Sequence, residues 1–417
     1  MKFLDKLLVA EVSIKQCSEI ELLLCCSRTH ISFEYAEHIR NLVSQNIDWN
    51  QLLQIARLHG VLPLLYWQLK DICPDSVPTD VLEQLRRNFE TNAQKNLALT
   101  AELVKLIKLF QKNGIPIIPF KGAILASFVY KKLTLREFID IDILIPEQFI
   151  KESSNLLNLQ GYKSQFKIND AHIANYAKIN NEQTFWHKDK QVTVDLHWEL
   201  LPKPFNSYAA LAWSRNEQVY LKNTAVQSIN IETLLLYLCA HGTKHSWSHL
   251  KFLCDIAELI SSHPDLDWHW IEAQSEKLGN KQMLLLGLYL CQELFGTVLP
   301  AHLVQQLQTS QQIKTLASQV QQKMVLPQTQ INNVFEQRDI YIRTLSVKDK
   351  LWFYFRVFMA PTALELTMVS LPVWLFYLYY LVRPIRLLIK YTLAFSYNPV
   401  FNGTAPISAL NNNAKVG

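Results

Sequence analysis

The hydrophobic pattern of the chain changes its period between Gly114 and Pro202, and this change sets the expected fold. Inside that segment apolar residues alternate with polar ones or run continuously, which is typical of β-strands. Strands are predicted at residues 115–120, 138–145, 161–168, 182–188 and 191–200. Helical patterns at 123–131 and 147–158 separate the first three strands. The segment therefore predicts a small unit of about 90 residues that mixes helices and strands.

The sequence on both sides of this unit has the period of amphipathic helices. Apolar residues recur at helical spacing from 18 to 112, and again most clearly at 231–261 and 281–296. No repeat of fixed period is present, which argues against a solenoid. We expect an α+β protein in four parts: an N-terminal helical region (1–112), an α/β core (113–202), a helical domain (203–335) and an apolar C-terminal helical segment with a tail (336–417).

The composition is that of a globular protein with a large core, because 49% of the 417 residues are hydrophobic and 18% are charged. The 41 basic and 36 acidic residues give a formal charge of +5. This balance is too even to predict a nucleic-acid-binding protein. We therefore expect no sequence-specific nucleic-acid partner.

The cysteines and the N-terminus bear on the compartment. The seven cysteines form no C-x-x-C pair, and most lie in apolar helical stretches. Buried free thiols in a reducing cytosol fit this pattern better than disulfides or zinc. Asp5 and Lys6 interrupt the stretch that would have to be the apolar part of a signal peptide. A cytoplasmic location is expected.

The C-terminal region contains an apolar stretch with two interpretations. The 17 residues from Leu366 to Val382 carry no charge, which is the short end of a membrane span, and Pro372 lies among them. In the first interpretation they form a core helix pair. In the second, residues 366–390 lie at a membrane surface, with Arg383, Arg386 and Lys390 at the headgroups. The proline and the short length favour a buried or interfacial segment over a true span.

The predicted strand at 138–145, FIDIDILI, carries two acids on one face. Asp140 and Asp142 are two residues apart, so their Cβ atoms lie about 7 Å apart on the same side of the strand. Carboxylates this close repel unless a cation lies between them, and Mg²⁺ or Mn²⁺ is the natural one. Asp195, in a later apolar strand, offers a third carboxylate and so the ligands for two ions about 4 Å apart. The alternative is a solvated face of an edge strand.

A second pattern upstream is typical of phosphate binding. The strand at 115–120 is followed by Lys121 and Gly122 and then by a helix that begins near Ala123. Glycine permits close approach of the backbone to a phosphate, the start of a helix favours anions, and the lysine supplies a positive charge. Arg136, four residues before Asp140, either binds a phosphate with two hydrogen bonds or caps the helix before the strand.

Three further residues are candidate substrate contacts. His197 shares the strand face of Asp195, and would touch substrate, orient Asp195 or simply be a hydrogen-bonded, half-buried histidine. Lys244 and His245 lie in the following helical region, from which they could contact a substrate.

These residues follow a recognisable order: Lys121-Gly122-Ala123, Tyr130, Arg136, Asp140-Ile141-Asp142 and Asp195-Leu196-His197-Trp198. The order resembles an uncharacterised nucleotidyltransferase family whose fold is that of the DNA-polymerase-β-type nucleotidyltransferases. Residues 48–66 and 238–260 and the late YLVRPIRL also look like this family. The resemblance covers about 18–395, nearly the whole chain.

The resemblance implies a polymerase-β-like core with a mixed β-sheet, in which Asp140, Asp142 and Asp195 bind the metal ions. Asp195 would also act as the base or orient the attacking hydroxyl. The implied reaction is attack of an acceptor on the α-phosphate of an NTP such as ATP, with release of pyrophosphate. One departure is that Gly122-Ala123 stands where the superfamily usually has Gly-Ser, so one hydroxyl donor is missing, and Lys121 or Ser127 would have to replace it.

Two other functions remain open from the sequence. The chain could be an inactive nucleotide-binding or scaffold protein at a membrane periphery, or a phosphotransferase that moves the γ-phosphate to a small molecule. The acceptor also stays open among a sugar, a lipid, a small molecule and a protein hydroxyl.

Overall fold

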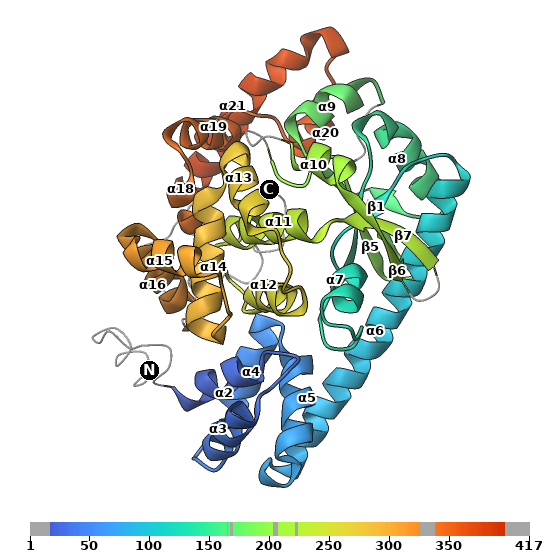
Figure 1. The fold of residues 1–417 in the computed structure, drawn as a ribbon. Coiled ribbons are helices and arrows are strands. Elements are labelled where there is room, and N and C mark those ends of the chain that lie inside the picture. The colour runs from blue at the N-terminus through green and yellow to red at the C-terminus, as the bar shows by residue number, and fades with distance from the viewer. Residues whose placement is uncertain are drawn as a thin grey trace. The chain divides into compact units, whose positions relative to one another are not determined.

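The computed structural model describes residues 17–164, 166, 170–202, 207–221, 224–325 and 338–396 (Figure 1). The chain forms two compact units, residues 1–353 and 354–417. The boundaries expected near 112, 202 and 335 all fall inside the first unit. Residues 1–12, on which the expectation of no export rests, lie outside the described part of the chain.

The first unit begins with the expected helices: α2 (Ser18–Cys26), α3 (Phe33–Val43), α4 (Trp49–His59), α5 (Leu62–Ile72) and α6 (Thr79–Lys112). Their ends follow from the sequence, since Ser32 and Asp48 accept backbone N–H groups at the starts of α3 and α4. Helix α6, the long cyan helix of Figure 1, contacts α5, α7 and β2. Its buried Asn96 donates to the carbonyls of Leu133 and Arg136, at 2.6 and 2.8 Å, and so fixes the loop that leads into β2.

The five predicted strands all form, and several are shorter than predicted: β1 (Ile118–Pro119), β2 (Asp140–Leu144), β3 (Lys163–Ser164), β4 (Glu182–His187) and β5 (Val192–His197). They make one sheet in the order β1-β2-β5-β4-β3. Strands β2 and β5 are parallel and the other neighbouring pairs are antiparallel. The sheet is therefore mixed, and the α+β class with helical flanks is confirmed.

The register of the sheet divides its residues between two faces. Asp142 pairs with Asp195, and on the other side of β5 Thr184 and Glu182 pair with Asp195 and His197. Because paired residues share a face, the polar side chains gather on one side. The opposite side is mainly apolar, and its buried residues include Ile141, Ile143, Phe185, Val194 and Leu196. Burial of each such side chain stabilises the fold by roughly 1.5–3 kcal/mol, which fixes the register.

Shorter elements connect the strands: α7 (Ala123–Phe128), η3 (Glu147–Phe149), α8 (Ile150–Leu159), η4 (Asp170–His172), α9 (Ile173–Ile179) and α10 (Tyr208–Ser214). A hairpin of β6 (Asn216–Leu221) and β7 (Thr224–Ile229) follows. The prediction of helix alone after residue 202 was wrong here. Val219, Leu221 and Val226 are buried at strand spacing, but this short alternation gives a weaker signal than the long helical pattern after it.

Helices again fill the rest of the first unit: α11 (Ile231–Lys244), α12 (Lys251–Ser262), α13 (Trp268–Leu278), α14 (Lys281–Phe295), α15 (Ala301–Thr309), α16 (Gln311–Val325) and α18 (Asp339–Thr344). Helix α19 (Val347–Phe358) crosses the boundary between the units. Helix α11 packs on α12 and α14. A Cβ on Gly242 of α11 would lie 2.3 Å from the ring of the buried Trp247, so this helix interior needs glycine there.

The second unit contains α20 (Ala363–Met368), η6 (Val373–Leu378) and α21 (Tyr379–Ser396). Its centre is charged, because the fully buried Glu365 lies 2.6 Å from Arg386 and 3.6 Å from Arg383. Tyr379 ties the segment between α20 and η6 to α21 by donating to the Val369 carbonyl at 2.6 Å. Within the described residues, no helix has both the length and the apolar character that crossing a bilayer requires.

Candidate active site

Two aspartates and a histidine form the centre of the polar face. One ligand atom from each of Asp142, Asp195 and His197 lies within 4.8 Å of the other two. Asp142 is on β2 and the other two are on β5, so the parallel pairing of these strands creates the group. Asp140 is on the same face, opposite Thr193, and is not part of this group. Of the sequence-based triad, Asp142 and Asp195 are in this group, and His197 is its third member.

Lys121 supplies the positive charge next to Asp142. Its Nζ lies 2.6 Å from Asp142 Oδ1, and the Asp142 side chain is buried while that of Lys121 is 15% exposed. Burial alone would lower the pKa of Lys121, but Asp142, together with Tyr237 and Asp140, raises that pKa well above the ordinary value. Burial would likewise raise the pKa of Asp142, but Lys121 and His197 lower it. The two groups are therefore a charged pair at neutral pH.

His197 lies between two carboxylates. Its Nε2 is 3.1 Å from Asp142 Oδ1 and its Nδ1 is 3.1 Å from Glu182 Oε2. Burial would lower the pKa of His197, but Glu182 and Asp142 raise it to about 9. The ring is therefore a cation at neutral pH, and both of its nitrogens carry protons.

The pKa of Asp195 is shifted in the opposite direction to that of Asp142. Burial, and then the charge of Asp142, raise the pKa of Asp195 to about 6. The Thr184 hydroxyl donates to Asp195 Oδ1 at 2.7 Å and fixes the orientation of the carboxylate. A carboxylate with a pKa this close to neutral is a suitable general base.

The turn after β1 requires glycine. Gly122 has φ +48° and ψ −116°, a conformation that side chains disfavour. A Cβ there would lie 3.3 Å from the Asp140 carbonyl oxygen and 3.4 Å from the Phe138 ring. Gly122 thus lets the turn that carries Lys121 lie directly against β2.

A family model described as uncharacterised nucleotidyltransferase matches residues 45–296. The chain belongs to this family. The match contains the sheet, Lys121, the aspartates and His197, and it assigns the chain a nucleotidyl-transfer role. No curated protein and no solved structure matches the chain.

Arg136 has a protein partner in this nucleotidyltransferase. Its Nε and Nη2 donate to the two carboxylate oxygens of Asp255 on α12, at 2.7 and 2.8 Å. The Tyr130 hydroxyl donates to the same carboxylate at 2.8 Å. All three side chains are buried, so the group joins the loop before β2 to the helical bundle. A phosphate contact by Arg136 stays a prediction.

Helix α11 brings its C-terminal end to the site. The Tyr237 ring lies 5.9 Å from Lys121 Nζ, and its hydroxyl is 3.2 Å from His241 Nδ1. The His241 ring is 4.6 Å from that of His245. Lys244 on the same helix interacts electrostatically with Glu182. The sequence-predicted contacts Lys244 and His245 are thus on the side of the site where α11 ends.

Sequence reasoning missed Glu182, Thr184 and Tyr237. The first two are alternate residues of a strand that was predicted, and their alternation toward the polar face was the available signal. Tyr237 offers no such signal, because its position depends on how α11 packs.

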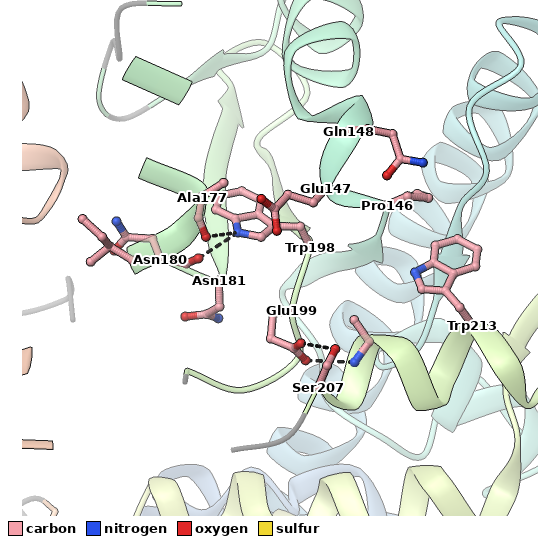
Figure 2. Close-up of a pocket in the computed structure, with 12 residues that line it drawn as sticks. Pro146, Glu147, Gln148, Ala177, Asn180, Asn181, Trp198, Glu199, Ser207 and Trp213 are labelled. Carbon is pink, nitrogen blue, oxygen red and sulfur yellow. Dashed lines mark hydrogen bonds between the residues drawn. The ribbon is translucent and has the colours of Figure 1, made fainter. Parts of the chain in front are cut away.

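A pocket of about 410 Å³ lies beyond the carboxyl ends of β2 and β5 (Figure 2). Trp198 forms one wall, and its Nε1 donates to the carbonyls of Ala177 and Asn180 at 3.1 and 2.7 Å. Asn181 also lines the pocket and donates to Glu182 Oε2 at 3.0 Å. Asn181 therefore connects the pocket to Glu182, the carboxylate that lies against His197.

Proposed function

We propose that this nucleotidyltransferase moves a nucleoside monophosphate from an NTP to a hydroxyl acceptor and releases pyrophosphate. The observation that carries the proposal is the group of Asp142, Asp195 and His197 beside the Lys121-Gly122 turn. A group of acids next to a glycine turn with a lysine is the combination that phosphate chemistry needs, namely metal ligands and a phosphate anchor.

The donor set fits Mg²⁺ or Mn²⁺. Carboxylate oxygens are the ligands these ions prefer, and Asp142 and Asp195 approach each other on neighbouring strands. We propose these two residues as ligands, with Asp140 as a third. When bound, the ion would neutralise charge on the phosphates. Because His197 lies between Asp142 and Glu182, at 3.1 Å from each, we assign it the role of holding Asp142 in place.

The chain's own residues have distinct parts in the reaction. Lys121 binds the triphosphate, and Gly122 and Ala123 let the phosphates approach the backbone. Asp195 accepts the proton of the acceptor hydroxyl, whose oxygen forms a bond to the α-phosphorus while the bond to the β-phosphate oxygen breaks. Lys244 and His245 contact the substrates from α11.

The test is incubation of the full chain with Mg²⁺, cell extract and each of the four NTPs, labelled at the α- or the γ-phosphate. We expect α-label in an acceptor fraction and γ-label in pyrophosphate. Asp142→Asn and Asp195→Asn should each abolish transfer while the circular dichroism spectrum stays unchanged. Transfer of γ-label to an acceptor would identify a phosphotransferase instead, and nucleotide binding without any transfer would identify an inactive binding protein.

A further inference from the structure

The second unit exposes an apolar face. We use this term for Met368, Trp374, Tyr377, Leu381 and Ile385, whose side chains are between 56% and 81% exposed. Leu381 and Ile385 lie one turn apart on α21, so they share one side of the helix. Tyr377 and Trp374 belong to η6, which directly precedes α21. A helix on the surface of a soluble domain normally turns such residues inward.

The interior of this unit is charged where an interior is usually apolar. Arg383, between Leu381 and Ile385 on α21, and Arg386, next to Ile385, turn inward to the buried Glu365. Arg383 also donates from Nε to the Val357 carbonyl at 2.9 Å. The ion pairs fix the rotation of α21, and this rotation presents Leu381 and Ile385 outward. The apolar face is therefore a built feature of the unit and not a frayed helix end.

The charges around the face indicate its partner. Residues 354–396 carry four basic residues and one acidic residue, so their net charge is +3. Arg383 and Arg386 turn inward to Glu365, which corrects the expectation that they lie at headgroups, and Lys390 is the exposed basic residue of α21. Trp374 and Tyr377 are the residue types enriched where a bilayer meets water. Two copies of a segment with this net positive charge would repel each other, which disfavours self-association. We propose that the apolar face docks on a lipid bilayer with anionic headgroups, in the plane of the interface.

Flotation with vesicles tests this proposal. The full chain is mixed with phosphatidylcholine vesicles that contain phosphatidylglycerol in a ratio of roughly two to one, or with phosphatidylcholine alone. We expect the chain to float with the anionic vesicles and much less with the neutral ones. Leu381→Glu with Ile385→Glu should reduce the floated fraction at least about tenfold.

A matched control adds the same charges elsewhere. Leu159 and Val298 in the first unit are 81% and 87% exposed, and Leu159→Glu with Val298→Glu should float like the unchanged chain. A milder variant, Trp374→Phe, should keep binding but lose part of the fluorescence quenching by brominated lipid. This quenching measurement tests the contact between residue 374 and lipid in a variant that stays folded.

Three results would overturn the proposal. The first is a chain that stays unbound with both kinds of vesicle. The second is equal loss of flotation in the control and in the Leu381→Glu, Ile385→Glu variant. The third is light scattering that shows a dimer of the unchanged chain which the same variant dissociates, because the face would then bind a second copy.

Discussion

The ammonium of Lys121 lies 2.6 Å from the buried carboxylate of Asp142. This pair compensates the charge of Asp142 in the structure described. A divalent ion would supply the same compensation and leave Lys121 able to bind phosphate. We therefore expect an exchange when metal and nucleotide bind: the ion replaces Lys121 as the counter-charge of Asp142, and Lys121 binds the phosphate instead.

Lys121→Met should destabilise the metal-free chain by about 3 kcal/mol or more, because Asp142 would lose one counter-charge in a buried setting. Mn²⁺ should then raise the melting temperature of the variant more than that of the unchanged chain. Lys105→Met, at a side chain that is 72% exposed, is the control and should change little. Equal shifts by Mn²⁺ in the Lys121 variant and the unchanged chain would argue against the exchange.

His197 makes the stability of the metal-free chain depend on pH. Its pKa is about 9 in the fold and about 6.5 when unfolded. A raised pKa stabilises the fold fully below pH 6.5, and the contribution is lost as the pH rises through 9. We expect a loss of up to about 3 kcal/mol between these limits in EDTA, measured by urea unfolding. In His197→Gln this loss of stability with rising pH should vanish. If the loss were unchanged in the variant, it would come from another titrating group.

Gly122→Ala should abolish nucleotidyl transfer and lower stability by about 1–3 kcal/mol, because the new Cβ would press on the Asp140 carbonyl. Gly114→Ala is the matched control. Gly114 also has a positive φ, +68°, but nothing lies within 4 Å of its Cβ position. The Gly114→Ala variant should lose only the stability that the positive φ costs, and it should retain activity. Similar activity in the two variants would mean that the close approach of the turn to β2 is not needed.

Arg136→Lys should lower the free energy of unfolding by about 3 kcal/mol, because lysine cannot donate to both oxygens of Asp255. A double-mutant cycle with Asp255→Asn, followed by urea unfolding, measures the coupling. If Arg136 acts only through Asp255, the KM for NTP should not change in the variant that remains folded. A large rise in KM would restore Arg136 as a phosphate contact.

The sequence allowed the sheet and the meeting of Asp142 with Asp195 to be predicted, because period-two alternation fixes which face a strand residue occupies. It did not predict that His197 would bridge Asp142 and Glu182, since that contact depends on strand order and register. The partner of Arg136 is 119 residues away in the sequence. Such pairing depends on how helices dock on the sheet, and no local pattern encodes it. The close packing of Gly242 against Trp247 likewise became visible only in three dimensions.

The contact of Tyr130 and Arg136 with Asp255 also limits how the chain can be divided. A fragment that ends at Pro202 would contain the whole sheet and every proposed metal ligand, but it would leave the Arg136 guanidinium buried without a counter-charge. We therefore expect the α/β segment to need α12 in order to fold. A minimal catalytic fragment would have to extend at least through that helix.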